Sequence, residues 1–444
     1  MRGQFCGRFE RISTMCDTAK YQQEVPVPNK NDTPLMVLLL FISLGLMLAG
    51  FFSTSPAHLF EGFINIQKHH GRLLSDFTVI GGTGAALVNA GLMGLFSLLV
   101  IKLAKVSISG PTFAAVFTII GFSLFGKTIL NAVPIVFGVF ISAKIARKEL
   151  KSYLLIALFG TALGPLVSFI MAHSGLPGPF ALVAGSLAGI VTGILLPPIA
   201  MAMLRLHEGF SLYNVGFACG FLGLFLASIL VAFQLDISTA IIWNTVPSPL
   251  LMLLVPVISL MLILIGISMD TIKNNVNNFL KIQKLPGRLP TNFMDNASTA
   301  ASLINAGVLG LLGSLYLWLI GADFNGPTLG GLFTVIGFAT FGKHLRNTWP
   351  VVAGVITATL LFGKSLTAPV PVLALLFGTT LAPIGGEMGI IPGFIAGFLH
   401  LLLVDRTASW HGGLDLYNNG FSGGLVATLM LALSEWIKSN RETK

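Results

Sequence analysis

Residues 110–127 read GPTFAAVFTIIGFSLFGK and residues 326–343 read GPTLGGLFTVIGFATFGK, with 11 of the 18 positions identical. The offset of 216 residues holds without a gap from Gln67 to Pro134, and the similarity continues as far as Tyr213-Asn214 and Tyr417-Asn418. An internal repeat in an apolar chain is typical of membrane proteins built from two related halves, with the working site between them. The duplication therefore bears on both the fold and the site.

The composition indicates an all-α polytopic membrane protein. Of the 444 residues, 54% are hydrophobic and 10% are charged, and the mean hydropathy is +0.86, which excludes a water-soluble surface for a chain of this size. The net charge of +9 resides in short loops and tails, so it indicates membrane topology and not nucleic-acid binding. Cys6, Cys16 and Cys219 follow no disulfide or metal-binding spacing, and we expect no signal peptide within residues 1–33.

The apolar segments predict seven spans in each half. An odd number makes the halves cross the bilayer in opposite directions, so the sequence predicts about 14 transmembrane segments in two inverted repeats. The predicted parts are a cytoplasmic tail (1–33), a first repeat (34–235), a linker (236–247), a second repeat (248–438) and a cytoplasmic tail (439–444). The predicted spans are 35–52, 77–101, 106–126, 129–146, 152–173, 178–204 and 214–234, then 249–269, 297–320, 322–342, 348–363, 369–386, 389–404 and 416–437.

The distribution of lysine and arginine supports this topology. With the N-terminus inside, 21 of the 26 basic residues fall on the cytoplasmic side and five fall outside. If the Gly-Pro-Thr segments only dipped into the membrane and returned, the basic cluster 144–151 would lie outside. We therefore predict a multi-pass protein of the plasma or inner membrane with both termini cytoplasmic. Between the first two spans, residues 53–76 form either a short interfacial helix or a plain loop.

The Gly-Pro-Thr segments predict two half-helices, at 111–126 and 327–342. Sixteen helical residues extend about 24 Å, which is less than the hydrocarbon core of about 30 Å. The alternating stretch 106–109 predicts extended chain before the first of them, and residues 322–325 occupy the same place before the second. Proline favours a first helical turn because its missing N–H would be unpaired there, and the preceding glycine permits a sharp turn.

In an inverted repeat, we expect the N-termini of the two half-helices to approach each other near the membrane midplane. A helix N-terminus carries about half a positive charge and free N–H groups, so two of them facing one cavity would bind an anion or a carbonyl solute. A Gly-Pro kink in a lipid-facing helix is the alternative. The predicted substrate-binding residues at this place are Gly110, Pro111, Thr112, Gly326, Pro327 and Thr328.

The run Ser109-Gly110-Pro111-Thr112, after a short alternating stretch, resembles the third transmembrane segment of sulfate-permease-type anion transporters. The resemblance implies the seven-plus-seven inverted repeat that those proteins share with nucleobase transporters, with substrate held between the half-helices of the third and tenth spans. The chain departs from both families, because no soluble domain follows the last predicted span and the span 249–269 lacks an acidic residue. As a whole it more closely resembles a bacterial multi-pass family of unknown function with the same duplication.

Asn89 and Asn305 occupy the repeated pattern Asn-Ala-Gly-x-x-Gly in the second span of each half. An amide within a transmembrane helix either lines a substrate cavity or forms a hydrogen bond across a close, glycine-lined helix contact. Both interpretations stay open, and we include the two asparagines among the candidate binding residues.

Glu387, in Pro-Ile-Gly-Gly-Glu-Met-Gly, has no acidic counterpart in the first half. Within the membrane it would be a candidate for proton or sodium coupling, whereas in a loop beyond the helix it would lie near the surface. Lys127 and Lys343 end the half-helices, where a cation suits the negative end of the helix dipole, so the sequence favours an anchoring role for both.

The sequence contains no nucleotide-binding loop, zinc-ligand spacing or catalytic triad, so we expect no enzymatic activity, no metal and no cofactor. The leading hypothesis is a secondary transporter for a small solute, with an anion as one candidate, working by alternating access through the midplane site. The alternatives are a urea-like passive channel for a small neutral solute and a non-transporting membrane scaffold subunit. The expected partners are a small-molecule or ion substrate and the lipid bilayer, without nucleic acid; a homodimer is left open.

Overall fold

The computed structural model describes residues 32–71 and 73–442, which form helices with one isolated bridge between Ser75 and Ile242. Residues 1–31 and 443–444 of the predicted tails, with Cys6 and Cys16, lie outside the described residues. The helices of the first half are α2 (Thr33–Ser53), α3 (Pro56–Lys68), α4 (Phe77–Ile80), α5 (Gly82–Leu103), α6 (Gly110–Phe122), α7 (Ile129–Ile145), α8 (Leu154–Gly160), α9 (Gly164–His173), α10 (Gly178–His207) and α11 (Asn214–Ala232).

The second half repeats this order of helices except at α9, in whose place it has a π-helical turn. Its members are α12 (Pro249–Met269), α13 (Ile272–Ile282), α14 (Phe293–Asn296), α15 (Thr299–Ile320), α16 (Gly326–Phe338), α17 (Leu345–Leu361), α18 (Pro369–Gly378), α19 (Ile390–Trp410) and α20 (Asn418–Glu442). Short 3-10 turns at Leu150–Tyr153, Thr161–Leu163 and Thr379–Leu381 and a π-helical turn at Ile384–Met388 connect some of them.

Nine helical segments in the described part of the chain are long and apolar enough to cross a membrane, so the protein is a multi-pass membrane protein. Four further predicted spans coincide with shorter apolar helices of the described chain, Gly110–Phe122, Ile129–Ile145, Gly326–Phe338 and Pro369–Leu381. The nine segments are Thr33–Ser53, Gly82–Leu103, Leu150–His173, Gly178–His207, Asn214–Ala232, Pro249–Met269, Thr299–Ile320, Ile390–Trp410 and Asn418–Arg441.

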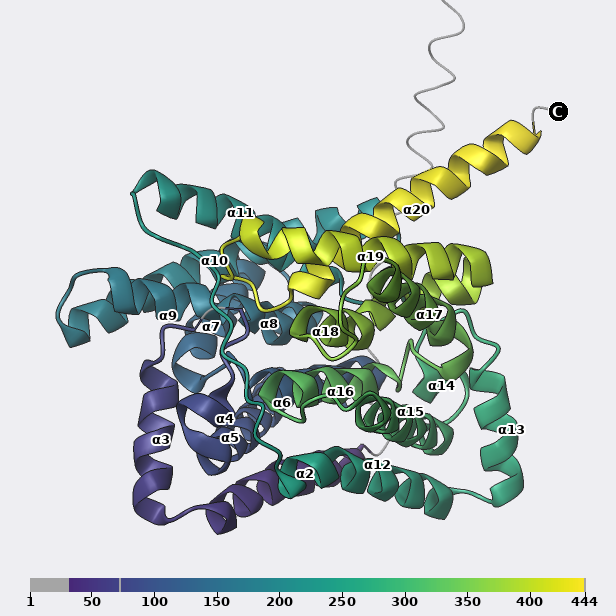
Figure 1. Ribbon diagram of the computed structural model, residues 1–444, viewed down its shortest axis with the longest axis horizontal. Helices are drawn as coiled ribbons and strands as arrows, with labels where there is room; N and C mark the ends of the chain where they lie inside the picture. The colour runs from purple at the N-terminus through teal and green to yellow at the C-terminus, as the bar shows by residue number, and fades with distance from the viewer. Residues whose placement is uncertain (1–31, 72, 443–444) are drawn as a thin grey trace, which may run out of the picture.

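The two halves pack in the same way. Helix α2 contacts α5 as α12 contacts α15, and α7 contacts α10 as α17 contacts α19. Helices α3 and α13, which follow the first helix of each half, stand at opposite edges of the molecule in Figure 1. The segment 53–76 thus contains a helix, α3, and is not the plain loop of the alternative interpretation.

The half-helices α6 and α16 lie side by side in the centre of the molecule (Figure 1). They are antiparallel, because Gly121 near the end of α6 faces Gly330 near the start of α16, and Ala114 faces Gly337. A Cβ atom on Gly121 would lie 2.9 Å from the Gly330 backbone, so only small residues permit this approach. The half-helices form one of the buried contacts between the two halves, together with α11 and α20. Each half-helix ends four residues earlier than predicted.

Candidate functional site

The N-termini of α6 and α16 do not face each other, so the predicted midplane site between them is wrong. The Gly110 carbonyl at the start of α6 accepts a hydrogen bond from Thr340 just beyond the end of α16, at 3.0 Å, and Gly326 at the start of α16 packs against Leu124 beyond the end of α6. The N-termini therefore lie at opposite ends of an antiparallel pair of 13-residue helices, about 20 Å apart. Side-by-side packing of the small residues separates them.

The predicted binding threonines form local caps. The Thr112 hydroxyl accepts the Ser109 N–H at 2.6 Å, and the Thr328 hydroxyl accepts the Asn325 N–H at 2.8 Å. Each threonine is thus the reciprocal member of a capping box that begins a half-helix. Pro111 and Pro327 occupy the first turn, as the sequence predicts.

A protein carboxylate already occupies the N-terminus of α16. Asp76 Oδ1 accepts the Gly326 N–H at 3.3 Å and the Thr78 N–H at 2.9 Å. At the N-terminus of α6 the Asn292 amide oxygen lies next to Gly110 instead. The position where an anion would bind at the N-terminus of α16 is thus filled by a side chain of the protein. The partial positive charge of this helix end stabilises Asp76.

Asn89 and Asn305 bind the backbone at the ends of the half-helices. Asn89 Nδ2 donates to the carbonyls of Ser123 and Lys127, at 2.7 and 2.9 Å, and Asn305 Nδ2 donates to those of Ala339 and Lys343, both at 2.8 Å. Of the two interpretations left open by the sequence, the structure shows the helix-contact role. These amides fix the turns from which the two lysines project.

Glu387 lies at the protein surface and is part of an ion-pair network. Arg288 contacts Glu387 Oε1 at 2.8 Å and Glu208 Oε2 at 3.1 Å, and the Glu387 side chain is 38% exposed. The residue belongs to the π-helical turn before α19. The structure places it apart from the buried centre of the molecule.

The most unusual feature of the core is a pair of fully buried lysines at equivalent positions. Lys127 Nζ donates to Thr161 Oγ1 at 2.8 Å and to Tyr417 OH at 2.6 Å. Lys343 Nζ donates to Thr379 Oγ1 at 2.7 Å and to Tyr213 OH at 2.5 Å. We call these groups the Lys127 cluster (Lys127, Thr161, Tyr417) and the Lys343 cluster (Lys343, Thr379, Tyr213). Each contains a tyrosine from the other half of the chain.

Broken helices position the two threonines. Pro165 and Pro383 lie four residues after Thr161 and Thr379, so neither threonine carbonyl can accept the usual helical hydrogen bond. The chain forms a 3-10 turn at each place, Thr161–Leu163 and Thr379–Leu381. The hydroxyls of both threonines donate to a carbonyl three residues earlier in the chain. Their oxygens accept a hydrogen bond from Lys127 and Lys343, respectively.

Histidine–asparagine pairs position the two tyrosines. His207 Nε2 lies 3.0 Å from Asn214 Oδ1, and His411 Nε2 lies 3.1 Å from Asn418 Oδ1. The asparagines in turn donate to carbonyls of the preceding long helix in each half. These histidines are buried links within the loop and do not lie at the protein surface, and each asparagine directly follows the tyrosine of a cluster.

Aromatic rings fill the space between the two clusters. The ring centroids of Phe159 lie 6.5 Å from Tyr417 and 5.7 Å from Phe338, and Phe338 lies 4.6 Å from Tyr213. Lys127 Nζ is 4.4 Å from the Tyr417 ring centroid, and Lys343 Nζ is 4.6 Å from that of Tyr213. The rings form an apolar layer that separates the two ammonium groups and offers each a cation–π contact.

The clusters are suited to binding anions. An ammonium group has three N–H donors, and each lysine uses two of them within its cluster, which leaves one for a ligand. Both tyrosine hydroxyls accept from lysine. The Tyr417 hydroxyl retains its own O–H donor, whereas the Tyr213 hydroxyl also interacts with Thr379. A buried charge costs several kcal/mol, so the fold gains no stability from lysine at these positions that a methionine would not give. The chemistry of the donors matches a small anion.

The sequence alone does not place Thr161, Thr379, Tyr213 and Tyr417 in a site, and it favours an anchoring role for Lys127 and Lys343. The signal was present, because Gly-Lys and Tyr-Asn are both kept in the two copies. A lysine that only complements a helix dipole can be exposed. A lysine kept at equivalent places among the apolar segments of both copies therefore indicates a further role.

Comparison with known proteins gives one finding. Residues 55–232 and 271–436 both match the model of a single family, described as "Protein of unknown function (DUF1576)". No curated protein and no solved structure matches the chain. The two matched segments correspond to the two halves of the fold and include every member of both lysine clusters.

Proposed function

We propose that this chain, which belongs to the DUF1576 family, is a secondary transporter for a small anion that binds at the Lys127 and Lys343 clusters. The observation that carries the proposal is the burial of two lysine amino groups at equivalent positions, each bound by hydroxyls from both halves. Ionisable side chains within membrane proteins mark substrate or ion pathways, because their burial is otherwise unfavourable.

Occlusion of both clusters favours a carrier over a channel. Lys127, Lys343 and Thr161 have no exposed surface, and Tyr213 and Tyr417 are only 8% and 6% exposed. A passive urea-like channel needs a continuous path lined by polar groups, whereas a carrier passes through a state closed to both sides. A scaffold subunit has no use for two charges in its core, so the same burial argues against that alternative.

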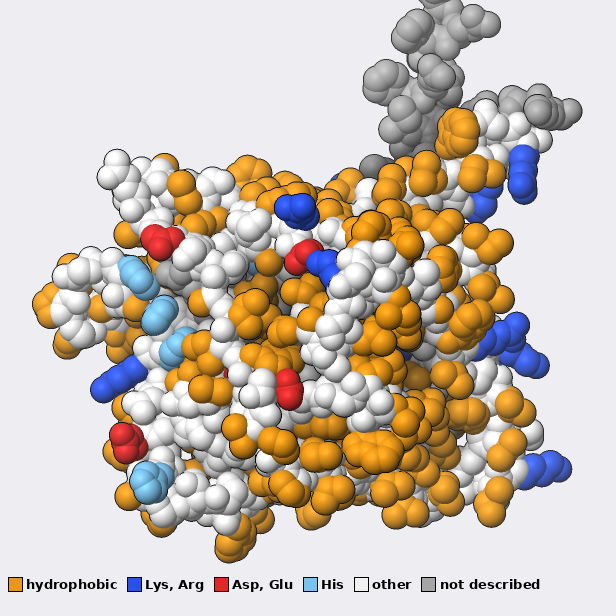
Figure 2. All heavy atoms as spheres, in the orientation of Figure 1, with side chains coloured by type: hydrophobic (Ala, Val, Ile, Leu, Met, Phe, Trp, Pro, Cys, Tyr) orange, Lys and Arg blue, Asp and Glu red, His pale blue; other side chains and the backbone are white. Residues whose placement is uncertain are grey.

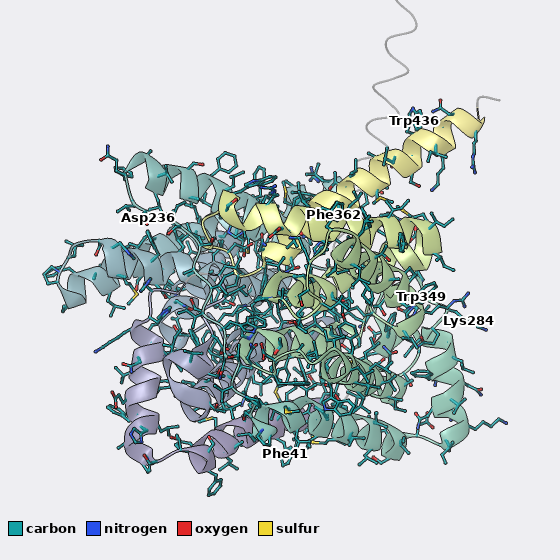
Figure 3. All side chains as sticks on the ribbon, in the orientation of Figure 1. Phe41, Asp236, Lys284, Trp349, Phe362 and Trp436 are labelled. Atoms are coloured by element: carbon teal, nitrogen blue, oxygen red, sulfur yellow. The ribbon has the colours of Figure 1, made fainter. Side chains whose placement is uncertain are left out.

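The inverted topology belongs to the proposal. Lys273, Lys281 and Lys284 are exposed on and beside α13, and basic side chains gather at the edge of the molecule where α13 stands (Figure 2). In Figure 3, Trp349 and Lys284 lie at this same edge, and Asp236 of the linker lies at the opposite one. Lysine and arginine are enriched on the cytoplasmic side of membrane proteins, whereas tryptophan is found at both interfaces. The lysines therefore lead us to place α13 inside and α3 outside.

Anion flux into liposomes tests the proposed function. The purified protein is reconstituted and exposed in turn to chloride, nitrate, sulfate, phosphate and succinate, with urea as the neutral comparison. We expect saturable uptake of at least one anion and counterflow when the same anion is loaded inside. Flux that rises linearly with concentration would support a channel, and the absence of flux for every solute would leave the scaffold alternative.

Cysteine accessibility tests the inverted topology. In a variant without the native cysteines, we expect Lys148→Cys and Lys364→Cys, at equivalent loops of the two halves, to react with a membrane-impermeant maleimide from opposite sides. Position 148 should react from the cytoplasmic side because it belongs to the basic cluster 144–151. Labelling of both positions from the same side would exclude the inverted arrangement, whatever the outcome of the transport assay.

A further inference from the structure

The surroundings of the two lysine clusters differ by one carboxyl group. Asp415 lies two residues before Tyr417, and the residue two positions before Tyr213 is Ser211. Both side chains are fully buried. The Ser211 hydroxyl is 3.2 Å from Thr380 Oγ1, so the Lys343 cluster has a neutral neighbour where the Lys127 cluster has a carboxyl group. The pseudo-symmetry of the centre is therefore broken in charge.

Asp415 is incompletely hydrogen-bonded. Its Oδ1 accepts the Tyr417 N–H at 2.9 Å, while its Oδ2 is buried and has no hydrogen-bond partner. The ionisable groups that face it are Lys127 from the turn after α6, Cys219 from α11, and Tyr417 at the start of α20. His411 at the end of α19 accepts the Asp415 N–H, at 3.4 Å.

Lys127 and Asp415 interact electrostatically without a direct hydrogen bond. The ammonium group of Lys127 binds Thr161 and Tyr417, and Tyr417 connects the two charges because its N–H donates to Asp415 while its hydroxyl accepts from Lys127. An ionised Asp415 offsets the charge of Lys127, yet it leaves a buried oxygen unpaired, which is unfavourable. A proton on Oδ2 removes that negative charge.

An anion bound at the Lys127 cluster would compete with Asp415. It would supply the negative charge that Lys127 needs, and it would place a second negative charge close to the carboxyl group. A like charge nearby favours the protonated form of an acid. Ser211 cannot respond in this way, so the Lys343 cluster binds an anion without a proton. Anion binding and protonation are thus coupled at the Lys127 cluster and not at the Lys343 cluster.

We propose that Asp415 takes up a proton on Oδ2 when an anion occupies the Lys127 cluster, so that anion and proton are transported together. The Oδ2–H bond forms with a proton from the water on the side to which the cluster is open, and it breaks when the anion leaves on the other side. The proposal rests on the proposed transport function, and it assigns to one residue the coupling that drives accumulation.

Infrared difference spectroscopy tests the protonation of Asp415 without knowledge of the substrate. The reconstituted wild-type protein is compared at acidic and alkaline pH, and we expect the band of a buried carboxylic acid that titrates. Asp415→Asn should lose this band, and Glu435→Gln, which removes an exposed carboxyl group of α20, should retain it. An unchanged band in Asp415→Asn would overturn the proposal.

Proton movement during anion transport tests the coupling. Liposomes containing a pH-sensitive dye receive a jump of whichever of the five anions gives the largest wild-type uptake. We expect internal acidification in the wild type and none in Asp415→Asn, which should still exchange the anion by counterflow. Acidification that persists in Asp415→Asn, or uptake that follows a sodium gradient and ignores a proton gradient, would refute proton coupling while leaving anion transport established. A titrating band without any anion flux would refute the proposed transport alone.

Discussion

Lys127→Met and Lys343→Met are each expected to reduce anion uptake about 100-fold or more. Lys343→Met, whose cluster has Ser211 nearby where the other has Asp415, is also expected to unfold at the wild-type temperature or above it. Removal of one partner from a buried, hydrogen-bonded charge pair costs about 2–5 kcal/mol of binding, and 100-fold corresponds to about 3 kcal/mol. Methionine has a similar volume and needs no solvation of a charge, so the fold loses little and can gain about 1–4 kcal/mol. Uptake into liposomes and thermal unfolding of the purified variants measure the two effects.

Measuring anion uptake and the unfolding temperature together distinguishes a binding role of the lysines from an anchoring role. If the lysines only complemented the dipoles of α6 and α16, their removal would lower the unfolding temperature and leave the uptake per folded molecule unchanged. Lys102→Met is the matched control, because Lys102 is an exposed lysine near the end of α5. We expect the control to transport and unfold like the wild type. Uptake at the wild-type rate in Lys127→Met would contradict the proposed site.

Gly121→Leu and Gly330→Leu are expected to destabilise the protein strongly. A Cβ atom on Gly330 would lie 2.3 Å from Phe125 Cε1 and 2.9 Å from the Gly121 carbonyl oxygen, so the two halves must separate to admit a leucine. Overpacking of a close contact costs about 1–3 kcal/mol or more. Thermal unfolding followed by size-exclusion chromatography should show a lower unfolding temperature and less folded protein.

Gly45→Leu provides the control for this pair. Gly45 belongs to the membrane-spanning helix α2, and a Cβ atom there would meet no other atom within 4 Å. The same substitution should therefore leave the unfolding temperature unchanged or raise it slightly, since leucine has a higher helix propensity than glycine. Equal stability of all three variants would mean that α6 and α16 do not pack as closely as described.

The sequence predicts where the helices lie along the chain, but it does not predict how they pack against one another. The repeat, the half-helices and the apolar segments follow from local patterns, and the structure confirms a multi-pass helical protein in which α6 and α16 begin at Gly110 and Gly326. The placement of their N-termini failed because a duplicated segment does not reveal whether two helices meet end to end or side by side. The pairs Gly121–Gly330 and Ala114–Gly337 decide this, and they act across the two halves.

The lysine clusters could not be predicted from the sequence for a similar reason. Lys127 contacts a tyrosine 290 residues later, and Lys343 contacts one 130 residues earlier. No residue spacing within a single segment predicts such a contact, although both tyrosines belong to the repeated Tyr-Asn pair. A polar residue kept in both copies of an apolar repeat should therefore be considered as a member of a site shared between the halves.

The exchange of tyrosines between the halves also constrains how this chain arose. Thr161 comes from the same half as Lys127, but Tyr417 comes from the other, and the reverse holds for Lys343. A shorter ancestor with one copy of the repeat could complete a cluster only by pairing with a second molecule of itself, and such a pair would have contained two identical clusters. Within one chain the two copies can differ, and Asp415 opposite Ser211 is a difference that a pair of identical molecules could not have.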